Sequence, residues 1–206
     1  MDKERAIRQL KEFEKFGKNP EEMRLAAESW ENDFQILVSI ILSARTRDET
    51  TIVVAESLFS KYPTAEKLSK ASLTDVEEKV RKVNFYRNKA KSVLACAKVL
   101  ISEYNGIVPH DFEKLVELPG VGRKTANVFL AEQGQDSIGI DTHVSYLSNK
   151  MGWTKSTNQK QVEEDLKNIF PQKYWKTLND TLVRFGKTHT SRKKKDLLVE
   201  QIKKIK

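Results

Sequence analysis

Two side chains of this chain are of types that can carry out covalent chemistry together, Lys124 and, 17 residues later, Asp141. A neutral lysine amine is a nucleophile that forms Schiff bases with electrophilic carbon. A fixed carboxylate stabilises developing positive charge and exchanges protons with nearby groups. Each residue also has a plainer interpretation, because most helical lysines are solvated and because Asp141 is well placed to cap the helix that follows it. The surroundings of the pair must therefore decide between the two interpretations.

Lys124 lies directly after a sharp break between two predicted helices, in the segment ELPGVGRKTA. Pro119 prevents the first helix from continuing, and Gly120 and Gly122 permit positive φ angles in a tight turn. The amides at the start of the second helix can then face an anion such as a phosphate oxygen. Such a contact ignores base identity and would position a nucleic acid without reading its sequence. A nucleotide-binding glycine loop is the alternative, but the sheet context and the Gly-Lys-Ser/Thr ending are both absent.

The complete string LPGVGRKTA resembles the helix-hairpin-helix signature of the endonuclease III family of DNA glycosylases. The resemblance extends from about Asp33 to Gly186, through FQILVSIILSA, YRNKAKSVL, LPGVGRKTANVFL, IDTHV and VEEDL. It implies double-stranded DNA with a damaged base or an abasic site as the partner. It also implies that the hairpin binds DNA through four consecutive residues, Gly120, Val121, Gly122 and Arg123.

The resemblance assigns the catalytic roles to Lys124 and Asp141. The family lysine at this place displaces the base and holds the sugar covalently, and the aspartate of a VDTH-like segment is the second catalytic residue; here Ile140 replaces the valine. Breaking a glycosidic bond builds positive charge on the sugar, which a carboxylate stabilises. Related adenine and thymine-mismatch glycosylases carry serine or tyrosine instead of the lysine. Lys124 therefore predicts a bifunctional enzyme that removes oxidised or fragmented pyrimidines and then cuts the strand by β-elimination.

An enzyme that acts on a base must extrude it and fill the gap that it leaves. The resemblance places Arg45 and Phe85 in the two loops that enter the duplex. Bacterial relatives typically carry glutamine at the place of Arg45, and relatives often carry leucine at the place of Phe85. A phenylalanine can unstack a base step. The alternatives are that Arg45 and Arg47 only contact phosphates and that Phe85 fills the core. Asp48 is expected to cap the following helix.

Further basic residues are candidates for contacts with the DNA backbone. Arg87 and Lys89 follow Phe85 closely, and Lys187 precedes the basic run at positions 192–195. The basic run also has a plainer interpretation, because charged runs are usually solvated surface.

The chain departs from most bacterial relatives of the family in its cysteine content. Those relatives end with four spaced cysteines that bind a [4Fe-4S] cluster, whereas residues 186–195 read GKTHTSRKKK and Cys96 is the only cysteine. One cysteine cannot ligate such a cluster. We therefore expect a branch of the family without the cluster, in which packing around Trp175, Leu178, Leu182, Val183 and Phe185 and a terminal helix from Lys193 replace it.

The sequence offers no metal site and no cofactor site. His110, His143 and His189 share no spacing typical of metal ligands, and Cys96 lies in an apolar helical segment, which predicts a small core residue.

Composition agrees with a partner that is a polyanion. The 206 residues carry 37 Lys and Arg against 29 Asp and Glu, a formal charge of +8. Positive charge favours nucleic acid through counterion release, although a lysine-rich composition without such a partner also explains it. The chain lacks the ~20 consecutive apolar residues of a membrane helix, and its first residues lack a signal peptide. We expect an intracellular, cytoplasmic, nucleoid-associated monomer.

The elements that position these side chains are all expected to be helices, because apolar residues recur at helical spacing almost everywhere. The sequence predicts helices over Glu21–Glu28 and over Thr74–Val83, the latter opened by a capping box from Thr74 to Glu77. The resemblance implies an all-α, two-lobed fold. A helical barrel lobe of residues 27–136 would end in the hairpin, and residues 1–26 and 137–206 would form the second lobe.

Two other functions compete with this prediction. One is a monofunctional uracil or thymine-mismatch glycosylase, and the other is a non-catalytic helix-hairpin-helix module that binds DNA. Lys124 argues against the first, and the joint presence of Lys124 and Asp141 argues against the second.

Overall fold

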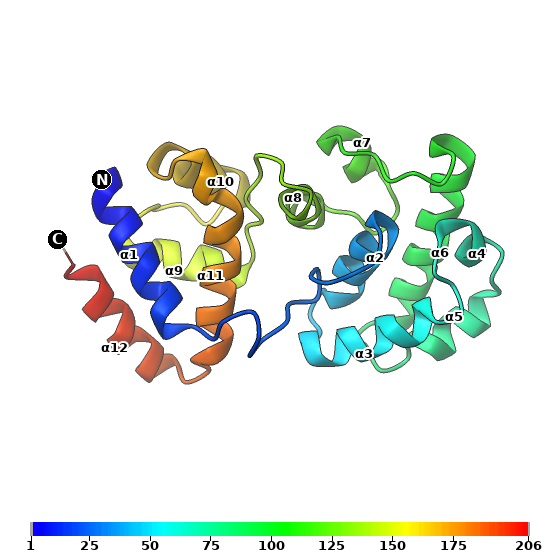
Figure 1. Ribbon diagram of the computed structural model, residues 1–206, viewed down its shortest axis with the longest axis horizontal. Helices are drawn as coiled ribbons and strands as arrows, with labels where there is room; N and C mark the ends of the chain where they lie inside the picture. The colour runs from blue at the N-terminus through cyan, green and yellow to red at the C-terminus, as the bar shows by residue number, and fades with distance from the viewer. Residues whose placement is uncertain (1, 206) are drawn as a thin grey trace. The chain divides into compact units, whose positions relative to one another are not determined.

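The computed structural model describes residues 2–205, and all regular secondary structure in that range is helical (Figure 1). The predicted all-α fold is thereby confirmed. The helices of the central part of the chain are α2 (Asp33–Ser43), α3 (Asp48–Phe59), α4 (Ala65–Ser69), α5 (Leu73–Val80), α6 (Tyr86–Tyr104), α7 (Phe112–Glu117) and α8 (Arg123–Glu132). The helices of the two ends are α1 (Lys3–Phe16), α9 (Thr142–Met151), α10 (Gln159–Ile169), the 3-10 turn η1 (Gln172–Tyr174), α11 (Trp175–Thr188) and α12 (Arg192–Lys203).

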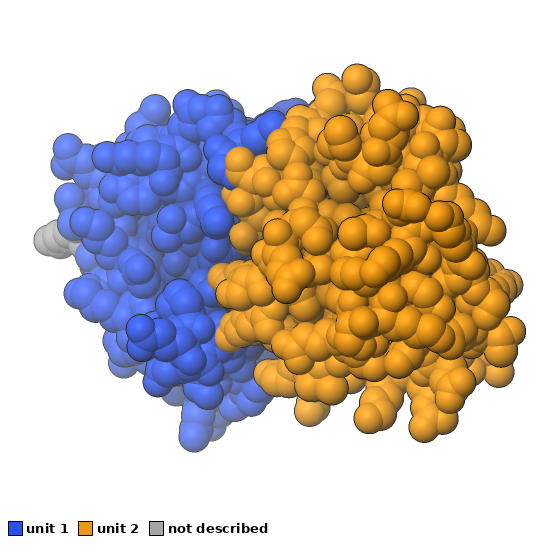
Figure 2. All heavy atoms as spheres, turned by 45° about the vertical axis from the view of Figure 1, so that its right-hand side comes forward, with its two compact units in different colours: residues 1–23, 134–206 blue, residues 24–133 orange. Residues whose placement is uncertain are grey.

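The chain divides into two compact units, which Figure 2 colours separately. Unit 1 combines Met1–Met23 with Gly134–Lys206, and unit 2 is the continuous stretch Arg24–Gln133. The N-terminal helix thus belongs with the C-terminal third of the chain, and the hairpin before α8 belongs to unit 2.

Helix α2 is the most deeply buried element of unit 2. Its sequence, DFQILVSIILS, is apolar on nearly every side, as expected of a helix surrounded by others. The two hydroxyls that interrupt it are satisfied locally, since Ser39 and Ser43 each donate a 2.8 Å hydrogen bond to the carbonyl three residues earlier. The Asn32 side chain caps its start by accepting from the Gln35 amide at 3.0 Å. A helix of this kind can serve as a rigid support for the loops that flank it.

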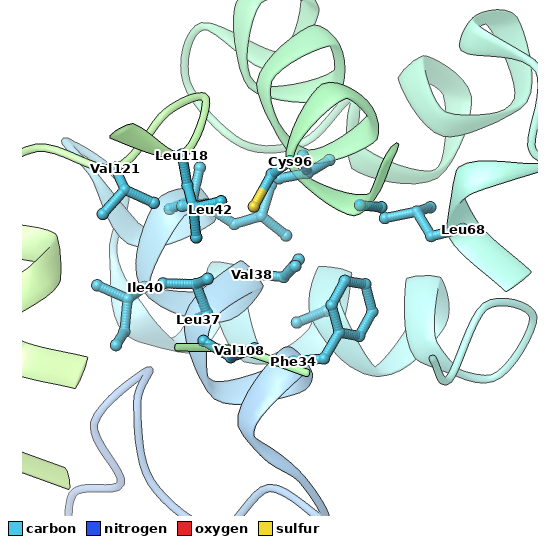
Figure 3. Packing of buried hydrophobic residues seen from close by; sticks show 14 of the residues in the cluster. Phe34, Leu37, Val38, Ile40, Leu42, Leu68, Cys96, Val108, Leu118 and Val121 are labelled. Atoms are coloured by element: carbon cyan, nitrogen blue, oxygen red, sulfur yellow. The ribbon is translucent and has the colours of Figure 1, made fainter. Parts of the chain in front are cut away.

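The core of unit 2 extends from α2 to the hairpin and to α6. Leu118 and Val121 of the hairpin are buried in the same cluster as Leu42 and Cys96 (Figure 3). Burial raises the pKa of the Cys96 thiol to about 12, so this cysteine is an inert core residue, as predicted.

Unit 1 is built around a chain of aromatic rings that joins α1 to the C-terminal helices. Phe13 packs edge-to-face on Phe185 at 4.7 Å and on Trp153 at 5.9 Å, and Trp153 packs in the same way on Phe170 at 4.9 Å. Edge-to-face pairs of this kind are each worth about 0.5–1.5 kcal/mol beyond the area that they bury. Leu178, Leu182, Val183 and Phe185 are buried in this core as predicted, whereas Trp175 is only half-buried.

Helix α12 is fixed to unit 1 by polar contacts near both of its ends. Asp196 accepts a hydrogen bond from the Tyr146 hydroxyl and pairs with Lys150 at 3.2 Å. Arg5 of α1 donates to the carbonyls of Lys203 and Ile205, each at 2.8 Å. These contacts hold the last helix, predicted from residue 193, against α9 and α1.

Two local predictions were wrong. Residues 21–28 form turns and irregular backbone in place of a helix. The Asn19 side chain and the Glu22 side chain accept hydrogen bonds from each other's backbone amides, at 2.9 and 3.1 Å, in competition with a helix. The helix expected from Thr74 begins earlier, at Leu73, because Ser72 is the N-cap and its hydroxyl accepts from the Asp75 amide.

Candidate active site

The hairpin between α7 and α8 has the tight turn that its sequence predicts. The Val121 amide donates to the Leu118 carbonyl at 3.0 Å, and Gly120 has a φ of +83° at the position where such a turn requires a positive value. A Cβ atom added to Gly120 would lie 2.7 Å from the Cβ of Ser92 on α6. Gly120 therefore has no room for any side chain.

The four hairpin residues that were predicted to bind DNA differ in what they expose. The Val121 side chain is buried, and its amide is engaged in the turn. Gly122 occupies the N-cap position of α8 and is exposed, with no heavy atom within 4 Å of an added Cβ. The Arg123 guanidinium is half-buried over the Phe112 ring, 4.8 Å from its centroid. Gly122 is thus the point of the hairpin at which another molecule can approach the backbone closely.

Lys124 is the second residue of α8 and is half-buried. No side chain caps this helix, so the first-turn amides of Lys124 and Thr125 remain open at its positive end. Within residues 2–205 the Lys124 amine has no hydrogen bond or ion pair. The structure therefore presents an unpaired amine directly behind the hairpin.

Asp141 is the N-cap of α9 in unit 1. Its Oδ1 accepts from the Val144 amide at 2.8 Å, which confirms the predicted cap. This hydrogen bond fixes the carboxylate while Oδ2 has no partner among the described residues. One oxygen thus orients the group, and the other is available for chemistry.

The segment that carries Asp141 is supported by two residues of α11 that sequence reasoning missed. Asn179 donates from its side-chain amide to the Gly139 carbonyl. A Cβ atom on Gly186 would overlap the His143 imidazole, 2.7 Å from its Cγ, so α11 and the first turn of α9 pack in contact. The signal in the sequence was a glycine inside an otherwise regular helical pattern, which usually has a packing reason.

Arg45 and Phe85, predicted for two separate loops, lie together at the surface of unit 2. The Arg45 guanidinium carbon is 5.1 Å from the centroid of the Phe85 ring, and Phe85 is 56% exposed. Both residues have left-handed backbone conformations, with φ of 55° and 58°. Such values are uncommon for residues other than glycine and occur preferentially at functional sites. The alternative that Phe85 fills the core is excluded by its exposure.

The flanking basic residues have different surroundings. Arg47 is exposed at the N-cap position of α3, with Asp48 as the first helical residue; the expectation that Asp48 caps this helix was wrong. Arg87 is exposed, with its guanidinium 5.3 Å from the centroid of the Tyr86 ring. Lys187, in unit 1, is half-buried in the last turn of α11.

Lys89 is buried, whereas a contact with a DNA phosphate would require it to lie on the surface. It is only 6% exposed, and its Nζ donates to the carbonyls of Leu42 and Ala44, each at 2.6 Å, and to the Thr46 hydroxyl at 2.9 Å. The prediction that Lys89 contacts DNA was therefore wrong, because three acceptors of its own chain already enclose the ammonium.

Within residues 2–205 no group of three or more histidine, cysteine, aspartate or glutamate side chains is arranged to hold a metal ion. The described helices include none that is long and apolar enough to cross a membrane.

The fold and the hairpin define a class of proteins that the comparisons identify. Residues 38–172 match the family described as HhH-GPD superfamily base excision DNA repair protein. The chain is 39% identical over 155 residues to endonuclease III of Thermotoga maritima, a match that covers 75% of this chain and 73% of that relative. It is 35% identical to endonuclease III of Rickettsia conorii over 192 residues, which cover 93% of this chain and 91% of the relative.

A solved structure of a trapped endonuclease III–DNA covalent intermediate, an estranged-adenine complex, superposes with a TM-score of 0.83. That match has 32% sequence identity and covers 93% of this chain and 89% of the other. The chain belongs to the endonuclease III family of the HhH-GPD superfamily. It is accordingly a bifunctional DNA glycosylase and abasic-site lyase of base excision repair.

Proposed function

We propose that this enzyme removes oxidised or fragmented pyrimidines from duplex DNA with Lys124 as the nucleophile and Asp141 as its catalytic partner. The observation that carries the proposal is the Lys124 amine in the first turn of α8, directly behind the hairpin, which has no hydrogen bond or ion pair within residues 2–205. A lysine without an ion pair at the positive end of a helix has no structural partner to lose when it reacts.

The chemistry follows from these two groups. The neutral Lys124 amine attacks C1′ of the damaged nucleotide, the glycosidic C–N bond breaks, and the base leaves with a proton. The positive charge that develops on the sugar is stabilised by the Asp141 carboxylate, whose orientation the Val144 amide fixes. The C1′–O4′ bond of the sugar then opens as O4′ takes up a proton, which leaves a protonated Schiff base between Lys124 and C1′ and makes the neighbouring C2′ hydrogen acidic. Loss of that proton expels the 3′ phosphate, which cuts the strand.

Lys124 lies in unit 2 and Asp141 in unit 1. We interpret unit 2 as the barrel lobe with the hairpin and unit 1 as the second lobe. The solved relative was trapped as a covalent intermediate with DNA, which supports covalent chemistry in the family.

We further propose that Arg45 and Phe85 open the duplex. Both are exposed, and together they present a cation stacked on an aromatic ring, a combination that can unstack a base step and fill the space of an extruded nucleotide. The solved relative holds an estranged adenine, which supports base separation in the family.

The remaining contacts would bind the DNA backbone without reading its sequence. The open amides after Gly122 supply one phosphate site, and Arg123, Arg47, Arg87 and Lys187 supply positive charge around the two units. The formal charge of +8 favours the same partner.

We propose further that the enzyme works as a monomer, at the nucleoid, and without an iron–sulfur cluster. The residues present do not fit a four-cysteine cluster, because the one cysteine of the chain is buried in the core of unit 2. The aromatic chain of unit 1 and the docked α12 supply the stabilisation that a cluster would otherwise give to the C-terminal segment.

Covalent trapping tests the proposal. The protein is incubated with duplexes that contain thymine glycol, uracil or an abasic site in the presence of borohydride, next to the variants Lys124→Ala and Asp141→Asn. We expect trapping on thymine glycol and on the abasic duplex, its loss in Lys124→Ala, and slower trapping in Asp141→Asn. Release of a base without trapping would instead indicate a monofunctional enzyme, and binding without either reaction would contradict the catalytic roles.

A further inference from the structure

The Lys89 ammonium joins three acceptors that belong to one loop. The carbonyls of Leu42 and Ala44 and the Thr46 hydroxyl surround Nζ at 2.6, 2.6 and 2.9 Å. An ammonium has three N–H donors and no acceptor, so all of its hydrogen-bonding capacity is used. Two of the acceptors lie at the C-terminal end of α2, where helical carbonyls lack partners within the helix. Lys89 thus caps α2 from another helix.

This arrangement is unusual because no carboxylate among residues 2–205 pairs with the buried ammonium. Lysine is almost never fully buried without a paired carboxylate, and burial lowers the pKa of Lys89 to about 8. An apolar side chain at this place would avoid the cost of desolvating a charge. A contribution to stability therefore does not explain why Lys89 is buried here. The remaining explanation is the geometry that Lys89 imposes on the loop.

The same loop is tied to a second one by Asn84. The Asn84 backbone amide donates to the Thr46 hydroxyl at 3.0 Å, and its side-chain amide donates to the Arg45 carbonyl. Thr46 thus accepts from both Lys89 and Asn84. We call these three residues, Lys89, Thr46 and Asn84, the loop clamp. The clamp connects the turn at Arg45 with the turn at Phe85, both of which have left-handed backbone conformations.

We propose that Lys89 is a positioning residue that presets Arg45 and Phe85 as one rigid element for opening DNA, an inference that rests on the proposed function of these two side chains. Two left-handed residues in neighbouring loops are costly conformations that persist only where the surrounding structure holds them. Ordering them before DNA arrives removes that cost from the binding step. Without the ammonium the loop loses all three hydrogen bonds to Lys89 at once.

The variant Lys89→Met tests this inference, since methionine replaces the stem but offers no donor. Thr46→Val removes the shared hydroxyl at nearly constant volume. Lys91→Met is the matched control, because Lys91 is an exposed lysine of the same helix. Duplex opening is measured by the fluorescence of 2-aminopurine placed opposite a stable abasic-site analogue, and chemistry by borohydride trapping on a single-stranded abasic oligonucleotide, which has no duplex to open.

We expect Lys89→Met to reduce the fluorescence response and the single-turnover excision of thymine glycol by about 10- to 100-fold, the usual effect of misplacing a group by about 1 Å. Trapping on the single strand should stay within about twofold of the wild type, as for small changes away from the reacting atoms. Thr46→Val should give duplex opening and excision between those of Lys89→Met and the wild type. Lys91→Met should match the wild type. Normal duplex opening by folded Lys89→Met would overturn the inference, as would an equal loss of both reactions. Failure of the wild type to trap at all would instead contradict the proposed function.

Discussion

The two glycines of the hairpin are expected to be required for different reasons, and exchanging each for alanine separates folding from DNA binding. Gly120 has a φ of +83°, and an added Cβ would lie 2.7 Å from the Cβ of Ser92. Gly122 has a φ of −100° and no heavy atom within 4 Å of an added Cβ. The first glycine is therefore needed by the protein itself, and the second only by a molecule that approaches the hairpin from outside.

Gly120→Ala should destabilise the fold. A left-handed conformation costs a residue other than glycine about 1–2 kcal/mol, and overpacking against Ser92 costs about 1–3 kcal/mol. Together these effects correspond to a loss of about 2–5 kcal/mol and to a fall in Tm of about 4–20 °C for a chain of this size. Adding Ser92→Gly removes the overlap but not the backbone strain. The double variant should therefore show a coupling of about 1–3 kcal/mol between the two positions.

Gly122→Ala should change stability by less than about 1 kcal/mol, because alanine restricts the unfolded chain but is a poorer N-cap than glycine. Its methyl group would instead stand where a phosphate approaches the amides of α8. Loss of one charge-assisted hydrogen bond is worth about 1.5–3 kcal/mol, which corresponds to an affinity about 10- to 100-fold weaker.

Thermal unfolding and fluorescence anisotropy with a duplex that carries an abasic-site analogue measure the two effects independently. The expected pattern is a low Tm for Gly120→Ala and weak binding with a normal Tm for Gly122→Ala. Wild-type affinity of Gly122→Ala would refute the argument that the hairpin binds DNA through its backbone. A wild-type Tm of Gly120→Ala would refute the steric argument.

Three further predictions concern stability. The folded-state pKa of Lys89, about 8, is below its ordinary value of 10.5, so its burial cost is complete below pH 8 and is relieved as pH rises toward 10.5. Urea unfolding should show the wild type gaining on the order of 3 kcal/mol relative to Lys89→Met across that interval. The hydrogen bond from Tyr146 lowers the pKa of Asp196 below its ordinary value of 3.8, so its stabilisation is present above pH 3.8 and is lost at lower pH. Asp196→Asn should thus have a lower urea midpoint than the wild type at pH 7, and the difference should disappear well below pH 3.8. Gly186→Ala should destabilise by the overlap with the His143 imidazole, about 1–3 kcal/mol, against about 1 kcal/mol of improved helix propensity. Calorimetry of the same change in a His143→Ala background should show a smaller loss, because alanine keeps only the Cβ, 3.1 Å from the added atom.

The parts of the structure that could be predicted from the sequence are those in which local chemistry and three-dimensional position agree. The hairpin is an example, since Pro119 and Gly120 specify their turn within four residues. The cap at Asp141 is another, because a capping side chain reaches an amide only three residues away. The failure at Glu21–Glu28 is of the same local kind, with the Asn19 side chain competing for backbone groups that the apolar spacing assigned to a helix.

Lys89 could not be predicted, because its position depends on a contact across 47 residues of sequence. A lysine at the start of a basic helix looks the same in the sequence whether it meets a phosphate or the end of α2. The deciding quantity is the distance between two helix ends, which no periodicity encodes. The same holds for Gly186, whose missing side chain is explained only by an imidazole 43 residues earlier in the chain. In this enzyme the groups proposed to react are visible in local motifs, whereas the groups proposed to aim them depend on long-range contacts. Variants of the second kind are therefore the more informative tests of the structure.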